Sequence, residues 1–160
     1  MRVIPSIDIR GGKVVRLAQG DYAKETVYSD SPLDIAKKWE GCGAKMIHIV
    51  DLDGALEGRL KNEDAVRRIA AEVKADIELG GGIRDEATIE SVLAAGVDRV
   101  VLGTSALQEG FVKRMGWRFG KKIIVGIDAK DGIVRTKGWI QETGLKAVDF
   151  ARRLEDTGIG

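Results

Sequence analysis

Two aspartates stand at equivalent places in the chain, 120 positions apart. Asp8 ends the apolar run 3–7 and Asp128 ends the apolar run 123–127, and a basic turn that contains glycine follows each of them. Two carboxylates in matched positions suit an acid and a base that act on one substrate. Aspartates also cap turns after strands without any catalytic role. Because capping alone does not predict the same offset in both copies, we favour an acid–base pair.

A glycine run at 80–82 joins a predicted strand to a helix that starts at Asp85, and Arg84 between them either helps to bind an anion or pairs with a surface acid. Glycines let backbone N–H groups come close to an anion, and a helix N-terminus adds partial positive charge. The next predicted strand also ends in a turn of small residues, at 103–106. A tight strand-to-helix turn explains one such feature, but two neighbouring turns predict a phosphate site.

Further candidates are polar or aromatic residues close to predicted strand ends. Trp139 lies in a glycine-flanked loop, where it either stacks on a flat heterocycle or packs the loop down. His48 has no neighbouring histidine or cysteine to complete a metal site, so we expect a hydrogen-bonded residue inside the fold, near the ligand. Asp51 ends the second strand and is expected at the mouth of the site. Arg16 and Gly20 follow the first strand, in a segment that forms either a lid or a loose surface loop.

Apolar, β-branched runs alternate with stretches of helical period. The predicted strands lie near 2–8, 46–51, 76–79, 98–102 and 122–127. The predicted helices run over about 31–41, 62–73, 85–96, 108–118 and 146–156. Nearly continuous apolar strands are typical of parallel strands buried on both faces. Ser31, Asn62 and Asp85 are the expected helix caps, and Trp39 and Trp117 are expected in the core.

Five β–α units in this order predict an α/β protein, either an open doubly wound sheet or a (β/α)8 barrel. The repeat of 120 residues favours the barrel, because two such halves approach the roughly 250 residues of that fold. We therefore predict one incomplete (β/α)8 TIM barrel domain over 1–160, with five β–α units and an internal repeat that begins near 1 and near 121. In such a barrel Asp8 and Asp128 share one mouth, because active sites form at the carboxyl ends of the strands. Strands one and five would keep open edges, which predicts self-association.

The composition excludes several classes of protein. The 160 residues carry 26 basic and 25 acidic side chains, so the net charge of +1 does not favour nucleic acid or an anionic membrane as a partner. No apolar stretch approaches the roughly 20 residues that span a bilayer. Cys42 is the single cysteine and cannot form a disulfide within the chain, so a reducing cytoplasm is the expected location.

These motifs resemble the histidine-biosynthesis barrel family. The resemblance is carried by Ile-Pro-Ser-Ile-Asp at 4–8, Gly-Lys-Val-Val-Arg-Leu at 12–17, His-Ile-Val-Asp-Leu at 48–52, Gly-Gly-Gly-Ile-Arg at 80–84 and Gly-Ile-Asp at 126–128. The family has two branches, the phosphoribosylformimino-aminoimidazole carboxamide ribotide isomerase and the cyclase subunit of imidazole glycerol phosphate synthase. The segments 19–22 and 138–143 look like the isomerase.

The resemblance implies an Amadori rearrangement that converts the aminoaldose ProFAR into the aminoketose PRFAR, with no metal and no organic cofactor. It implies that Asp8 is the base, that Asp128 is the acid, and that Trp139 stacks on the imidazole of a small phosphorylated ribotide. The predicted substrate-binding residues are Gly81, Gly82, Gly103, Thr104, Arg16, Gly20, His48 and Trp139.

The last three strands of that family and its second phosphate site have no counterpart in the sequence. We therefore expect a fragment that is a weak enzyme, or inactive, by itself. One alternative is the cyclase subunit, which shares the aspartate pair and the phosphate turns. A second alternative is a phosphate-binding or assembly fragment without turnover, in which Asp8 and Asp128 have no role.

Overall fold

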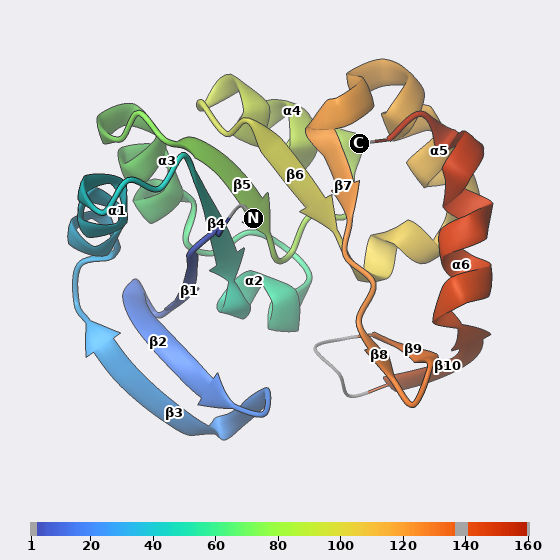
Figure 1. Ribbon diagram of the computed structural model, residues 1–160, viewed down its shortest axis with the longest axis horizontal. Coiled ribbons are helices and arrows are strands. Elements are labelled where there is room, and N and C mark those ends of the chain that lie inside the picture. The colour runs from blue at the N-terminus through green and yellow to red at the C-terminus, as the bar shows by residue number, and fades with distance from the viewer. Residues whose placement is uncertain (1–2, 137–140, 160) are drawn as a thin grey trace.

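The main sheet of the computed structural model has seven strands, in the order β3-β2-β1-β4-β5-β6-β7 (Figure 1). The structure describes residues 3–136 and 141–159. The parallel strands are β1 (Ser6–Arg10), β4 (Met46–Asp51), β5 (Asp76–Gly80), β6 (Arg99–Leu102) and β7 (Ile123–Val125). An antiparallel hairpin, β2 (Lys13–Ala18) and β3 (Asp21–Ser29), extends the sheet beyond β1.

Helices connect the parallel strands and cover one face of the sheet, which we call the outer face. They are α1 (Pro32–Gly41), α3 (Glu63–Glu72), α4 (Glu86–Ala94) and α5 (Glu109–Phe119), and Figure 1 shows them following one another around the sheet. The short helices are α2 (Leu52–Glu57), η1 (Thr104–Leu107), η2 (Gly120–Lys122) and η3 (Glu155–Thr157). A small sheet of β8 (Ala129–Lys130), β9 (Ile133–Thr136) and β10 (Gln141–Lys146) precedes α6 (Ala147–Leu154).

A row of aliphatic side chains on the outer face forms the centre of the core. The parallel register places Ile7, Ile49, Leu79, Val100 and Ile123 side by side across the five strands, and each is 0% exposed. Full burial of a side chain of this size stabilises the fold by about 1.5–3 kcal/mol. This row explains why the strands read as apolar runs in the sequence, because helices pack on this face along its whole width.

The opposite face of the sheet, the inner face, carries a different row. Successive residues of a strand point to opposite faces, so the neighbours of the core row lie here. They are Asp8, Val50, Gly80, Val101 and Ile124, in register across the same five strands. All except Gly80 are partly exposed. The inner face therefore borders open space at the level of Asp8.

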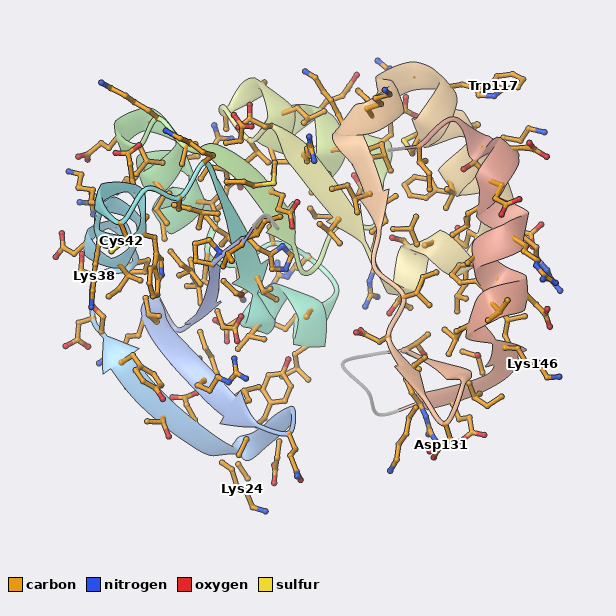
Figure 2. All side chains as sticks on the ribbon, viewed as in Figure 1. Lys24, Lys38, Cys42, Trp117, Asp131 and Lys146 are labelled. Atoms are coloured by element: carbon orange, nitrogen blue, oxygen red, sulfur yellow. The ribbon has the colours of Figure 1, made fainter. Side chains whose placement is uncertain are left out.

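The segments that begin at Asp8 and at Asp128 form hairpins of the same register. Asp8 is paired with Val15 across a two-residue turn, and the backbone N–H of Arg135 donates to the carbonyl of Asp128 at 2.7 Å. The pairs 9–14 and 10–13 of the first hairpin recur as 129–134 and 130–133 in the second. Figure 2 labels Asp131, which lies in the turn of the second hairpin, and Lys24, which lies on β3 beside the first hairpin. The offset of 120 residues thus relates two local structures as well as two stretches of sequence.

All five predicted strands and all five predicted helices are present, with ends that shift by a few residues at most. The segment after the first strand was predicted as a lid or a loose loop, but it forms the β2–β3 hairpin. As a result the predicted open edge of strand one is wrong, because β2 pairs with β1, and the edges of the main sheet are β3 and β7. The prediction of a long loop after strand five is also partly wrong, because this segment contains the strands β8, β9 and β10.

Two predictions about single side chains also need correction. Trp117 is 77% exposed and points into solvent from α5 (Figure 2), whereas the sequence predicted a core residue. Its ring lies beside Lys113, with 5.7 Å from Nζ to the ring centroid, because the opposite side of α5 already supplies the core contacts. Asn62 precedes α3 as predicted, but its side chain makes no cap bond to that helix. No helix in the described part of the chain is long and apolar enough to cross a membrane.

Candidate active site

A cavity of about 540 Å³ opens on the inner face, where the parallel strands end. Its size suits a small molecule. The described residues of the predicted site all line it, and they are Asp8, Arg16, Gly20, His48, Gly81, Gly82, Gly103, Thr104 and Asp128. Trp139 lies outside the described residues, so its stacking role stays a prediction.

The two aspartates reach the cavity from opposite ends of the parallel set. Asp8 stands on β1, and its Oδ1 accepts a hydrogen bond of 3.1 Å from the hydroxyl of Ser6. Asp128 follows β7 and is an exposed residue, but partial burial of its carboxyl raises the pKa of that group. Burial disfavours the charged form, so Asp128 holds a proton to higher pH than an ordinary aspartate does. A group of this kind suits a general acid.

The glycine turn after β5 is held against the turn after β4. Gly81 and Gly82 have φ values of +99° and +76°. A Cβ atom at Gly81 would lie 2.2 Å from the carbonyl oxygen of Asp51, so only glycine fits there. The hydroxyl of Ser105 donates to the carbonyl of Ile83 at 3.0 Å, and this buried bond ties the turn after β6 to the glycine turn. The two predicted phosphate turns are therefore fixed to each other.

Asp51 is fully buried and organises the turn after β4. Its carboxylate accepts hydrogen bonds from the backbone N–H groups of Gly54 (2.8 Å), Lys61 (2.7 Å) and Asn62 (2.9 Å). The side-chain amide of Asn62 donates a fourth bond, of 2.6 Å. The expectation that Asp51 lines the mouth is thus wrong, because strand alternation turns its side chain away from the inner face.

Asn62 and Asp53 extend this network to the first hairpin. The backbone N–H of Gly11 donates to Oδ2 of Asp53 at 2.6 Å, and that of Gly12 donates to Oδ1 of Asn62 at 2.9 Å. The amide of Asn62 also donates to Asp53 at 2.9 Å. The side chain of Asn62 is occupied by these contacts, which explains why it does not cap α3. The β1–β2 turn is therefore fixed relative to the start of α2.

Tyr22 was missed as a member of the cavity wall. Its hydroxyl donates to the carbonyl of Leu52 at 3.1 Å, and the guanidinium of Arg10 lies 5.2 Å from the ring centroid. Burial raises the pKa of this phenol above its ordinary value. Gln19 and Gly20 form a two-residue hairpin turn with positive φ at both residues, and the one hint of that turn in the sequence is Gly20. Recognition of that turn would have placed Tyr22 on a strand beside the cavity.

Arg84 also lines the cavity and packs against the turn after α2. A Cβ atom at Gly58 would lie 2.3 Å from Cζ of Arg84, so a side chain at position 58 would displace the guanidinium from its place. Within residues 3–136 and 141–159, Arg84 makes no ion pair. Anion binding by Arg84 stays a prediction. No group of three or more metal-ligating side chains occurs in the part of the chain that the structure describes.

A profile of the family of histidine biosynthesis proteins matches residues 2–160. The chain belongs to this family.

Family members from three bacteria illustrate the likeness. The proteins from Thermodesulfovibrio yellowstonii and Desulfatibacillum aliphaticivorans are 49% and 52% identical over 160 residues, which is 99% of the chain and 66% and 64% of their own lengths. The Bacillus subtilis protein is 49% identical over 155 residues, 96% of the chain and 63% of its own length. Each is named 1-(5-phosphoribosyl)-5-((5-phosphoribosylamino)methylideneamino) imidazole-4-carboxamide isomerase. The chain thus spans slightly less than two thirds of these relatives from the histidine biosynthesis family.

Replacement of Asp51 tests the network that holds the turns of this family member together. Asp51→Asn places an amide NH2 among N–H donors and removes the charge, and each lost bond to a charged group contributes about 1.5–3 kcal/mol. We expect the free energy of unfolding to fall by about 3 kcal/mol or more in urea titrations followed by circular dichroism. The control is Asp64→Asn, an exposed acid on α3, which should change it by less than about 0.5 kcal/mol. Equal losses in both variants would contradict the role of Asp51.

Replacement of Asp128 tests its raised pKa through stability. The folded state holds the Asp128 proton more tightly than the unfolded chain, so stability falls as pH rises from the unfolded pKa, about 3.9, through the folded pKa. Asp128→Asn removes that penalty. It should match the wild type near pH 3.5 and exceed it in free energy of unfolding at pH 7. Asp131→Asn, in the exposed β8–β9 turn, should show no such pH-dependent gain. A difference that stays constant with pH would contradict the raised pKa.

Proposed function

We propose that the chain acts as an aldose–ketose isomerase on an N-linked phosphoribosyl aminoaldose, converting ProFAR to PRFAR by an Amadori rearrangement. The observation that supports this most strongly is the placement of Asp8 and Asp128. They stand at opposite ends of one parallel set, begin hairpins of the same register, and line the same cavity. The substrate class comes from the isomerase name of the relatives at about half identity.

The proposed chemistry needs one acid and one base. Asp128 donates a proton to the ring oxygen of the ribose, which opens the ring and leaves a C=N bond at C1. Asp8 removes the proton from C2, the electron pair of that C–H bond forms the C1=C2 bond of the enol-amine, and the C=N electron pair returns to the nitrogen. Protonation of C1 and loss of the hydroxyl proton at C2 then give the ketone. The raised pKa of Asp128 supports its role as the acid, because it is protonated where an ordinary aspartate is not. This proton transfer is worth roughly 10²–10⁴ in rate in comparable enzymes.

The proposed contacts divide the cavity into zones. One phosphate of the substrate lies on the turns with Gly81, Gly82, Gly103 and Thr104, beside the Arg84 guanidinium. Arg16 and Gly20, from the β2–β3 hairpin, and His48, from β4, contact the rest of the ribotide. Trp139 stacks on its imidazole. No metal or organic cofactor takes part in this proposal.

We further propose that residues 1–160 form one incomplete (β/α)8 barrel domain with five β–α units and a repeat that begins near 1 and 121. The equal register of the two hairpins supports the repeat. With five parallel strands around the ligand, turnover is expected to be weak, and the unpaired edge of β7 is the expected site of self-association. The single cysteine, Cys42, is free and is the basis for proposing a reducing, cytoplasmic location.

The cyclase and the non-catalytic alternative share parts of this site. The cyclase shares the aspartate pair and the phosphate turns, but the relatives from the three bacteria carry the isomerase name. A phosphate-binding fragment without turnover would use the glycine turns and leave both aspartates without a role.

The proposed function predicts a shared loss of activity in two variants. In an assay for the aminoketose at high protein concentration, Asp8→Asn and Asp128→Asn should each lower the rate by roughly 100-fold or more. Both variants should still bind inorganic phosphate, because the glycine turns are untouched. Asp131→Asn, three residues from Asp128 and outside the cavity lining, should keep the wild-type rate. Absence of aminoketose from the wild-type chain, or unchanged rates in both variants, would contradict the proposal.

A further inference from the structure

A second polar row crosses the inner face, one pleat below the level of Asp8. The parallel register pairs Ser6 of β1 with His48 of β4, and His48 with Glu78 of β5. His48 belongs to the cavity lining, whereas Glu78 does not. Glu78 therefore lies beside the imidazole, underneath the surface that a ligand contacts.

The contact between His48 and Glu78 is short and sheltered. Nδ1 of His48 lies 2.8 Å from Oε1 of Glu78, and the two side chains are 27% and 14% exposed. An ionised carboxylate only accepts hydrogen bonds, so the hydrogen of this contact resides on Nδ1. In a neutral imidazole, Nε2 is then left without a hydrogen and acts as an acceptor.

We propose that Glu78 is a positioning residue that holds His48 in the Nδ1–H tautomer. Nε2 then accepts a hydrogen bond from a hydroxyl group on the sugar of the bound ribotide. The assignment of the ligand as a phosphorylated sugar rests on the proposed function. The tautomer itself follows from the geometry of His48 and Glu78 alone.

The supporting geometry continues on the neighbouring strand. Ser6 occupies the same row as Glu78, and its hydroxyl donates to Asp8, which lines the cavity. Each of the two cavity groups, Asp8 and His48, thus has a partner on this lower row. Such partners orient the groups that touch a ligand, and their loss weakens binding without removing any direct contact.

His48 is the single histidine of the chain. In protein without a histidine tag, NMR can therefore determine its tautomer without resonance assignment. Long-range ¹H–¹⁵N spectra, recorded where the imidazole is neutral, should show the proton on Nδ1. Glu78→Leu removes the acceptor and should populate the Nε2–H form. Glu78→Gln offers an amide oxygen in the same place and should restore the Nδ1–H form. A wild-type imidazole with its proton on Nε2 would overturn the proposal.

Measurements of ligand affinity distinguish a positioning role of Glu78 from a merely structural one. Glu78→Leu should bind ribose 5-phosphate roughly fivefold more weakly, the value of one hydrogen bond, while its affinity for inorganic phosphate stays unchanged. Glu78→Gln should bind ribose 5-phosphate like the wild type. In a His48→Ala background, Glu78→Leu should cause no further loss. An equal loss for both ligands, or a full additional loss in the His48→Ala background, would overturn the proposal.

These outcomes stay distinct from failure of the proposed function. If the chain makes no aminoketose, the tautomer and the ribose 5-phosphate affinities still decide whether Glu78 positions His48. If Glu78→Leu fails to fold, the isosteric Glu78→Gln and the wild-type spectrum carry the test.

Discussion

The buried carboxylate of Asp51 is the constraint on which the cavity depends. A charge inside a protein is tolerated only when its hydrogen-bonding capacity is satisfied, and Asp51 accepts four bonds from three residues. Those bonds dictate the path of the chain from β4 through α2 to the start of α3. The carbonyl of Asp51 in turn determines how closely Gly81 approaches, and Asn62 connects the network to the first hairpin.

The same sheet serves stability on one face and binding on the other. The outer face carries an uninterrupted aliphatic row that helices cover, and the row runs from Ile7 on β1 to Ile123 on β7. The inner face carries Asp8 and Gly80 together with three partly exposed aliphatic residues in the register positions directly beside that row. Strand alternation therefore places Asp8 and His48 at the cavity without removing any side chain from the core. The walls of the cavity are then formed by elements that follow the strand ends, including η1, the β2–β3 hairpin and the β8–β9 hairpin.

Much of this architecture can be predicted from the sequence. Periodicity and caps located every parallel strand and each of the longer helices, because long apolar patterns are the strongest local signal. The described site residues also came together as expected, since carboxyl ends of parallel strands meet at one edge. The repeat of 120 residues identified Asp8 and Asp128 before any geometry was known.

What failed depends on contacts between segments far apart in the chain. The segments 13–29, 129–136 and 142–146 have mixed polarity because one side of each of these strands faces solvent, so they look like loops in the sequence. Asn62 has the sequence of a helix cap, but its side chain serves the buried carboxylate of Asp51 instead. The contact between His48 and Glu78 could not be predicted from the sequence, because the two residues are 30 positions apart and are brought together only by the register of the sheet.

Whether Asp8 and Asp128 act on the same ligand is decided most directly by a crystal structure of the chain with bound PRFAR. We expect the open sugar chain between the two carboxylates, with Asp8 within about 3.2 Å, or one water, of the C1–C2 unit. One phosphate should lie on the turns of Gly81 and Gly103. Ligand bound outside the inner-face cavity, or an aspartate that points away from the sugar, would contradict the proposed acid–base pair.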